Sequence, residues 1–218
     1  MPWTWLRALP LLSASSAPQL TACLVILGVV LLTVADRRLA VLAFLLLRTA
    51  ALLLLWPAIR GAMGAVSAAS HVAIALICAT TECRLRPVRD RAAPRPSGHA
   101  AFLMTPPFRA LAASLGLLVA HGIVQTYALD LAPQTVALAM SWLAALGMLA
   151  LLLSNSGLGT AMGVVVLADG FRILYAVSQP SEWAWALWTV CDVLIVLAGA
   201  RLSRVEAVAG QGSAEGRA

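Results

Sequence analysis

The chain has 218 residues, of which 61% are hydrophobic and 11% are charged, and its formal net charge is +6. A water-soluble domain carries about 45–50% apolar and about 25% charged residues, so this composition excludes a soluble globular fold and indicates a lipid-embedded one. Backbone groups in lipid must be hydrogen-bonded within the protein. Because the apolar runs are continuous rather than alternating, they are predicted to be transmembrane helices and not barrel strands.

The first 19 residues are expected to be an N-terminal segment lying at the membrane interface. Trp3 and Trp5 are amphipathic side chains suited to that position. The apolar stretch from Ala8 to Leu12 is shorter than the ~7–15 residues of a signal-peptide core. We therefore expect this segment to belong to the mature chain.

Seven apolar runs follow, most of them near the ~20 residues that a helix needs to cross the hydrocarbon. They are Leu20–Ala35, Leu39–Ile59, Ala62–Thr81, Leu111–Ala128, Gln134–Ser154, Leu158–Ser178 and Trp183–Leu202. Charged breaks such as 36–38 and turn signals such as 155–157 separate them. The sequence therefore predicts an all-α polytopic bundle with about seven transmembrane helices.

The longest break, from Glu82 to Pro107, is rich in arginine and proline. We interpret residues 82–107 as a polar loop that divides three helices within 20–81 from four helices within 108–203. Residues 204–218 are interpreted as a disordered tail.

The arginines give a predicted orientation. Two lie in 36–38, six between Arg84 and Arg109, and three from Arg201 onward, and alternating helices would place all of these on one side. Only Arg7 and Arg60 fall on the other side. Arginine-rich loops remain cytoplasmic, so the N-terminus is predicted to be outside and the C-terminus inside, in the inner membrane of a prokaryotic cell. The same distribution accounts for the positive charge without a nucleic-acid partner.

Two other residue types carry weaker predictions. Five tryptophans near the ends of runs are expected to form an interfacial belt: Trp56, Trp142, Trp183, Trp185 and Trp188. Four cysteines without metal-binding spacing are expected to be small buried hydrophobes: Cys23, Cys78, Cys83 and Cys191.

Six ionisable residues fall inside the predicted spans, where a charge costs roughly 2.5–3.5 kcal/mol at the bilayer centre. They are Arg48, His71, His121, Asp169, Arg172 and Asp192. Asp169 and Arg172 are three positions apart and share a helix face. They are interpreted either as a self-neutralising pair that allows insertion or as a proton-relay carboxylate tuned by its arginine.

Asp192 has no ionisable neighbour on its own helix, so it requires a partner on another helix. Arg48, equally central in its span, is the predicted partner. The pair is interpreted as structural or as part of a chain of charges. His71 and His121 are candidate proton carriers because imidazole titrates near neutral pH, and packing roles remain open for both.

No nucleotide, hydrolase or metal motif is present. The glycines of 157–163 begin a span without a preceding strand, and are interpreted as helix-packing residues. We expect no catalytic residue, no cofactor and no metal.

Two stretches carry a family resemblance, 163–174 (GVVVLADGFRIL) and 191–202 (CDVLIVLAGARL). With the overall length, the span pattern and the hairpin around Asp36, they resemble the hydrogenase-4 membrane component E family. That family is related to the K-type subunit of NADH-quinone oxidoreductase and to the C-type subunit of multisubunit cation/proton antiporters. The family's glutamate falls on Ala168, one residue before Asp169.

The resemblance implies a non-catalytic membrane-arm subunit of a complex I-like or group 4 hydrogenase-like assembly. Such a subunit packs against antiporter-like subunits and contributes carboxylates to proton translocation, which would give Asp169 a relay role. The alternatives are a stand-alone transporter of a small solute or ion and a purely structural or assembly protein of the membrane.

Overall fold

The computed structural model describes residues 16–34, 36–56, 59, 62–92, 105–127, 133–178 and 181–215. Seven helices and no strand occur within these ranges. The helices are α1 (Ser16–Thr33), α2 (Arg37–Leu55), α3 (Ala62–Ala92), α5 (Pro106–Tyr127), α6 (Gln134–Leu153), α7 (Gly157–Ser178) and α8 (Glu182–Glu215). The predicted all-α bundle is confirmed.

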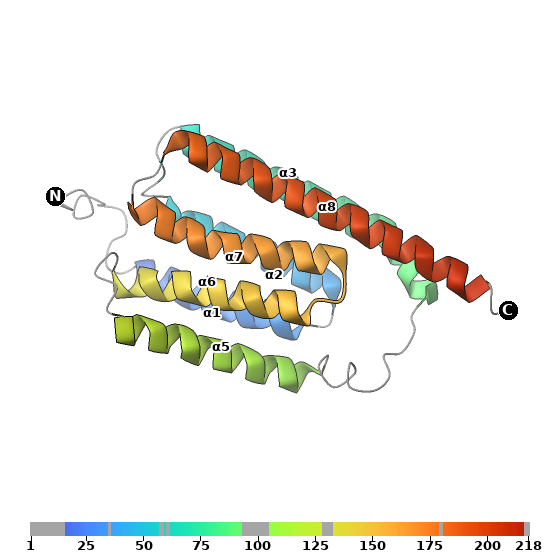
Figure 1. Ribbon diagram of the computed structural model, residues 1–218, viewed down its shortest axis with the longest axis horizontal. Helices are drawn as coiled ribbons and strands as arrows, with labels where there is room; N and C mark the ends of the chain where they lie inside the picture. The colour runs from blue at the N-terminus through green and yellow to red at the C-terminus, as the bar shows by residue number, and fades with distance from the viewer. Residues whose placement is uncertain are drawn as a thin grey trace.

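The helices form two layers (Figure 1). In one layer α5, α6, α7 and α8 lie side by side, and α1, α2 and α3 form the other. Across the layers α6 packs on α1, α7 on α2 and α8 on α3. Helix α1 begins at one end of the bundle and α8 ends at the opposite end, as an odd number of crossings requires.

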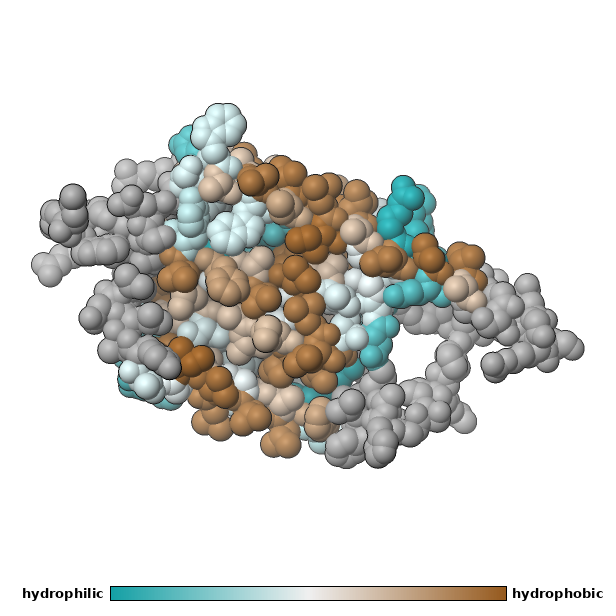
Figure 2. Space-filling model, in the orientation of Figure 1, coloured by the Kyte–Doolittle hydropathy of each residue, from teal (hydrophilic) through white to brown (hydrophobic). Residues whose placement is uncertain are grey.

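Six helices of the described chain, α2, α3, α5, α6, α7 and α8, are long and apolar enough to cross a membrane. Helix α1 has 18 residues, so at 1.5 Å per residue it spans ~27 Å, close to the ~30 Å hydrocarbon core. Figure 2 shows apolar side chains over the middle of the visible face and hydrophilic residues toward its ends. The chain is therefore a multi-pass membrane protein.

Glycines bring neighbouring helices of the first layer into backbone contact, as small residues do in membrane bundles. A Cβ on Gly147 of α6 would collide with the backbone of Leu167 on α7. A Cβ on Gly199 of α8 would lie 2.7 Å from the carbonyl oxygen of Gly157 on α7. The interpretation of 157–163 as a helix-packing segment is confirmed.

Two predicted boundaries are wrong. Helix α3 continues past Thr81 to Ala92, inside the predicted loop, and α8 continues past Leu202 to Glu215, inside the predicted tail. Hydropathy locates the end of the apolar run, but helical structure continues where tertiary contacts stabilise it. The α3 extension is anchored to the bundle, because Leu85 is buried and Arg37 Nε lies 2.6 Å from Glu82 Oε1. The α8 extension is anchored by Glu206 Oε2, which accepts a 3.3 Å hydrogen bond from the backbone N–H of Gly157.

The prediction for tryptophan is confirmed in part. Trp56 and Trp183 are exposed at helix ends. Trp142 is fully buried, and its Nε1 donates a hydrogen bond to Leu24 O across the layers at 3.2 Å. Gly28 leaves room for this indole, since a Cβ there would lie 2.9 Å from its Nε1. Trp142 is thus an anchor between α1 and α6 and not a belt residue.

The prediction for cysteine holds only for Cys78. The other three cysteines are exposed on the surface of the bundle, and all four are free thiols. The prediction failed because a continuous apolar run does not show which of its faces is turned inward.

Candidate functional site

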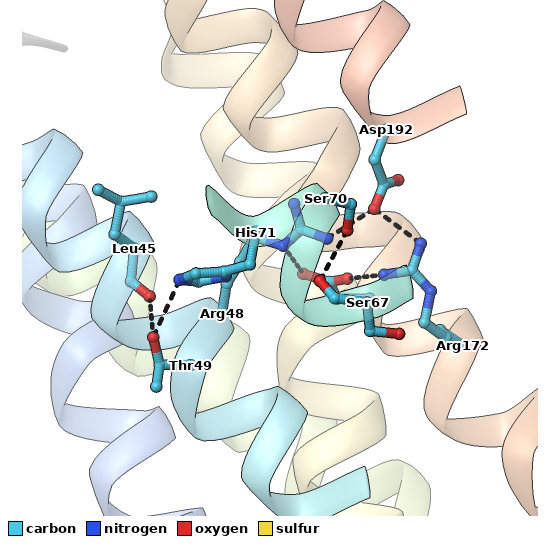
Figure 3. A network of polar contacts seen from close by, with 9 residues as sticks. Leu45, Arg48, Thr49, Ser67, Ser70, His71, Arg172 and Asp192 are labelled. Atoms are coloured by element: carbon cyan, nitrogen blue, oxygen red, sulfur yellow. Dashed lines mark hydrogen bonds and ion pairs between the residues drawn. The ribbon is translucent and has the colours of Figure 1, made fainter. Parts of the chain in front are cut away.

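Four charged side chains form a closed ring between α2, α7 and α8, three of them labelled in Figure 3. Arg48 of α2 contacts both acids, with Nη2 2.6 Å from Asp192 Oδ2 and Nε 3.1 Å from Asp169 Oδ2. Arg172 of α7 also contacts both, with Nη1 2.7 Å from Asp169 Oδ1 and Nη2 2.7 Å from Asp192 Oδ2. We call Arg48, Asp169, Arg172 and Asp192 the charge ring.

The charge ring has no net charge and almost no exposure. Its members are between 0% and 6% exposed. A lone buried charge costs several kcal/mol, but two cations and two anions in direct contact offset one another. Both predicted pairs, Asp169 with Arg172 and Arg48 with Asp192, are confirmed, and the structure joins them into one unit that connects α2, α7 and α8.

At this level of α7 the residue that faces the interior is Asp169 and not the preceding Ala168. Asp169 is buried in the ring, whereas Ala168 is only half-buried. Because one residue turns a helix by ~100°, the side chains of both positions cannot point into the same space. In this chain the inward position on α7 belongs to Asp169.

Tryptophans surround the Arg172 end of the ring. The guanidinium carbon of Arg172 lies 5.7 Å from the ring centroids of both Trp185 and Trp188. At this distance an aromatic face attracts a cation. Trp185 Nε1 also donates a 2.7 Å hydrogen bond to Ser67 Oγ, which connects the site to α3.

His71 of α3 lies beside the charge ring but does not belong to it (Figure 3). Its Nε2 is 3.1 Å from Thr49 Oγ1. The Thr49 hydroxyl donates its proton to Leu45 O at 2.8 Å. Since that hydroxyl has a single proton, both contacts are satisfied together when His71 carries its proton on Nε2 and donates it to Thr49; Nδ1 is then unprotonated in the neutral imidazole.

A small cavity connects His71 with the charge ring. Its volume is about 20 Å³, and His71, Arg48, Asp169, Arg172 and Ser70 are among the residues that line it. About 10–15 Å³ is enough for one water molecule. Two atoms of its lining residues, Arg48 Nη1 and Arg172 Nε, are buried and have no hydrogen-bond partner within the described part of the chain. The cavity therefore has the volume to hold a water molecule, and two of its lining residues carry unpaired donors.

His121 is not part of this site. It is exposed on α5, a helix that packs against α1 and α6. The charge ring and His71 belong to α2, α3, α7 and α8. Of the four predicted relay residues, the structure therefore brings together Asp169, Asp192 and His71 and leaves His121 apart.

Several residues of the site were not identified from the sequence. Ser67, Ser70 and Thr49 are polar groups that bond to the ring's neighbours or line the cavity. A signal for two of them was present, because Ser67, Ser70 and His71 have helical i, i+3, i+4 spacing on one face of the third span.

The fold and the site define a class of protein: a multi-pass α-helical membrane protein with a buried, charge-neutral ring of two arginines and two aspartates. Comparison with protein-family models, curated proteins and solved structures finds no match to this chain.

Proposed function

We propose that the chain is a non-catalytic membrane-arm subunit of a complex I-like or group 4 hydrogenase-like assembly in the inner membrane of a prokaryotic cell. It would pack against antiporter-like subunits, with its N-terminus outside and its C-terminus cytoplasmic. The positions of the ring residues within the resembling stretches support this proposal. The stretches 163–174 and 191–202, which carry the resemblance, supply three of the four members of the charge ring. Charged residues kept inside a membrane usually have a function.

One observation carries the proposal. His71, a residue type that can bind and release a proton, lines a polar cavity beside the buried carboxylates of the charge ring. Asp169 has an arginine within 3.1 Å of each carboxylate oxygen, so both of its oxygens are held by ion pairs. His71 forms no ion pair within the described chain, its ring lines the cavity, and a neutral imidazole has one nitrogen that can accept a proton. We infer that His71 carries the proton and that the charge ring provides a fixed field for it.

This division of roles indicates a route in the plane of the membrane. His71 lines the cavity on one side and is bonded on the other to Thr49, which is exposed on α2. A proton moving from the cavity to Thr49 would reach the surface of the chain between α2 and α3. An antiporter-like subunit covering that surface would continue the route.

Proton translocation in inverted membrane vesicles tests the relay. His71→Gln, which keeps a polar side chain but cannot accept a proton, should reduce translocation at least severalfold while the protein remains assembled. His121→Gln is the matched control, because His121 is exposed and remote from the site, and it should leave translocation unchanged. Unchanged translocation in His71→Gln would reject the relay and favour a purely structural role for the ring.

The rival class, a stand-alone transporter, makes a separate prediction. A transporter would move protons or a solute when the purified chain alone is reconstituted in liposomes. The subunit proposed here should show no ion flux above that of protein-free liposomes, and a clear flux from the chain alone would contradict the proposal.

A further inference from the structure

At the end of the bundle where α1 stops and α5 and α7 begin, the structure contains a second cleft, of about 210 Å³. Its lining includes the apolar side chains of Leu31, Leu153 and Met162. It also includes the polar side chains of Arg109 and Ser154. A cleft lined by both apolar and cationic side chains suits a ligand that has an apolar part and an anionic part.

Arg109 supplies the positive charge of this cleft. Its Nη1 donates to Leu32 O at 3.3 Å, at the carboxyl end of α1. Its Nε is buried without a hydrogen-bond partner, and within the described ranges no acid forms an ion pair with this side chain. Arg37, the other arginine of the cleft, contacts Glu82 at 2.6 Å, so its charge is offset. Among the residues that the structure describes, the charge of Arg109 therefore has no counterion.

The position of the cleft at the ends of apolar helices places it at the level expected for the interface between water and hydrocarbon. Arg109 lies in the first turn of α5, which begins at Pro106, and Leu31 lies in the last turn of α1. Both helices extend from this level into the bundle (Figure 1). In a bilayer this level is occupied by lipid phosphates, with acyl chains directly below them.

We propose that this cleft binds the headgroup of an anionic phospholipid, with the phosphodiester against the Arg109 guanidinium and an acyl chain along Leu31, Leu153 and Met162. Arginine is suited to this ligand because its planar fork donates two hydrogen bonds to phosphate oxygens. Basic pockets between transmembrane helices bind such headgroups. Arg38 and Arg201, exposed at the same end of the bundle, raise the local concentration of anionic lipid without contacting the cleft. The inference does not depend on the proposed proton relay.

Native mass spectrometry of the full-length protein in detergent tests the site, with phosphatidylglycerol, phosphatidylcholine and inorganic phosphate as probes. The wild type should retain one phosphatidylglycerol more tightly than phosphatidylcholine. Arg109→Gln should weaken retention by about tenfold or more, the effect of losing a charge-assisted hydrogen bond. Arg201→Gln, which removes an equal charge at the same end, should change it little. Equal weakening in both variants would overturn the site in favour of general surface attraction.

A second measurement on the wild type does not require a variant to fold. Phenylglyoxal modifies accessible arginines, and peptide mapping reports each position separately. Phosphatidylglycerol should protect Arg109 from modification, and inorganic phosphate at the same concentration should not. Equal protection by inorganic phosphate would overturn a lipid site in favour of a soluble-anion site, and no protection by either probe would overturn both.

Discussion

Arg48 on α2 and Asp192 on α8 are 144 positions apart in the chain, yet the Nη2 of the first lies 2.6 Å from the Oδ2 of the second. Arg172 contacts the same Oδ2 at 2.7 Å, so one carboxylate oxygen joins three helices. The contact forms in a medium that cannot solvate a free charge. Helix register in this bundle is therefore fixed by charge as well as by apolar packing.

Removing one charge from the ring should destabilise the protein strongly. Asp192→Asn leaves two buried arginines with a single acid, and a broken buried pair costs about 3–5 kcal/mol. The free energy of unfolding in detergent, measured by chemical denaturation, is the readout. A loss well below 1 kcal/mol would contradict the ring as a closed unit of four charges.

Replacing a cation and an anion of the ring together should lower the free energy of unfolding by less than the sum of the two single replacements. In Asp169→Asn with Arg172→Gln, the remaining pair of Arg48 and Asp192 is still neutral. The free energy of unfolding of the double variant should exceed, by at least 1 kcal/mol, the value calculated by adding the two single losses. The reason is that the effects of replacements within one network are not additive. Simple additivity would show that the four charges act as independent groups.

The close approach of α6 and α7 depends on Gly147. In Gly147→Ala the new methyl collides with the backbone of Leu167, so the two helices must separate and the melting temperature should fall by several degrees. Gly122→Ala on α5 is the matched control, since a Cβ there meets no atom within 4 Å. The control should be neutral or stabilise by up to about 1 kcal/mol through helix propensity. Similar melting temperatures for both variants would contradict the packing.

Ser203 of α8 supplies a cap to another helix. Its Oγ accepts a 2.8 Å hydrogen bond from the backbone N–H of Leu158, in the first turn of α7. Ser203→Ala should cost about 0.5–2 kcal/mol, the usual range for a lost cap. Ser114→Ala, where the hydroxyl is exposed and bonds only its own helix, should cost less, and equal losses would argue against the cap.

The proposed orientation predicts the accessibility of Cys83. This exposed thiol lies near the arginine-rich end of α3. In a variant that retains Cys83 and replaces the other three cysteines with serine, a membrane-impermeant maleimide should label inverted vesicles and not intact cells. Labelling of intact cells would place the arginine-rich end outside and reverse the topology.

The sequence predicted the seven helices because hydrophobic length alone determines them. It also predicted the pair of Asp169 and Arg172, which is local, and the partnership of Arg48 with Asp192, which follows from equal depth in the membrane. It did not predict that the two pairs join. Helices that are apolar on all sides carry no periodic signal for the face that turns inward, as the burial of Trp142 also shows.

Other features depend on contacts between distant segments. The extension of α3 to Ala92 is anchored by contacts such as the ion pair of Arg37 with Glu82, and hydropathy does not include such contacts. The bond between His71 and Thr49 depends on how α2 and α3 are rotated relative to each other. The isolation of His121 likewise follows from the position of α5 against α1 and α6.

The most direct test of the central claim, that this chain is a subunit of a larger membrane assembly, is an affinity purification in mild detergent through a tag at the C-terminus, followed by mass spectrometry. The account predicts stoichiometric recovery of antiporter-like and electron-transfer subunits with the chain. Recovery of the chain alone, or only as an oligomer of itself, would contradict it.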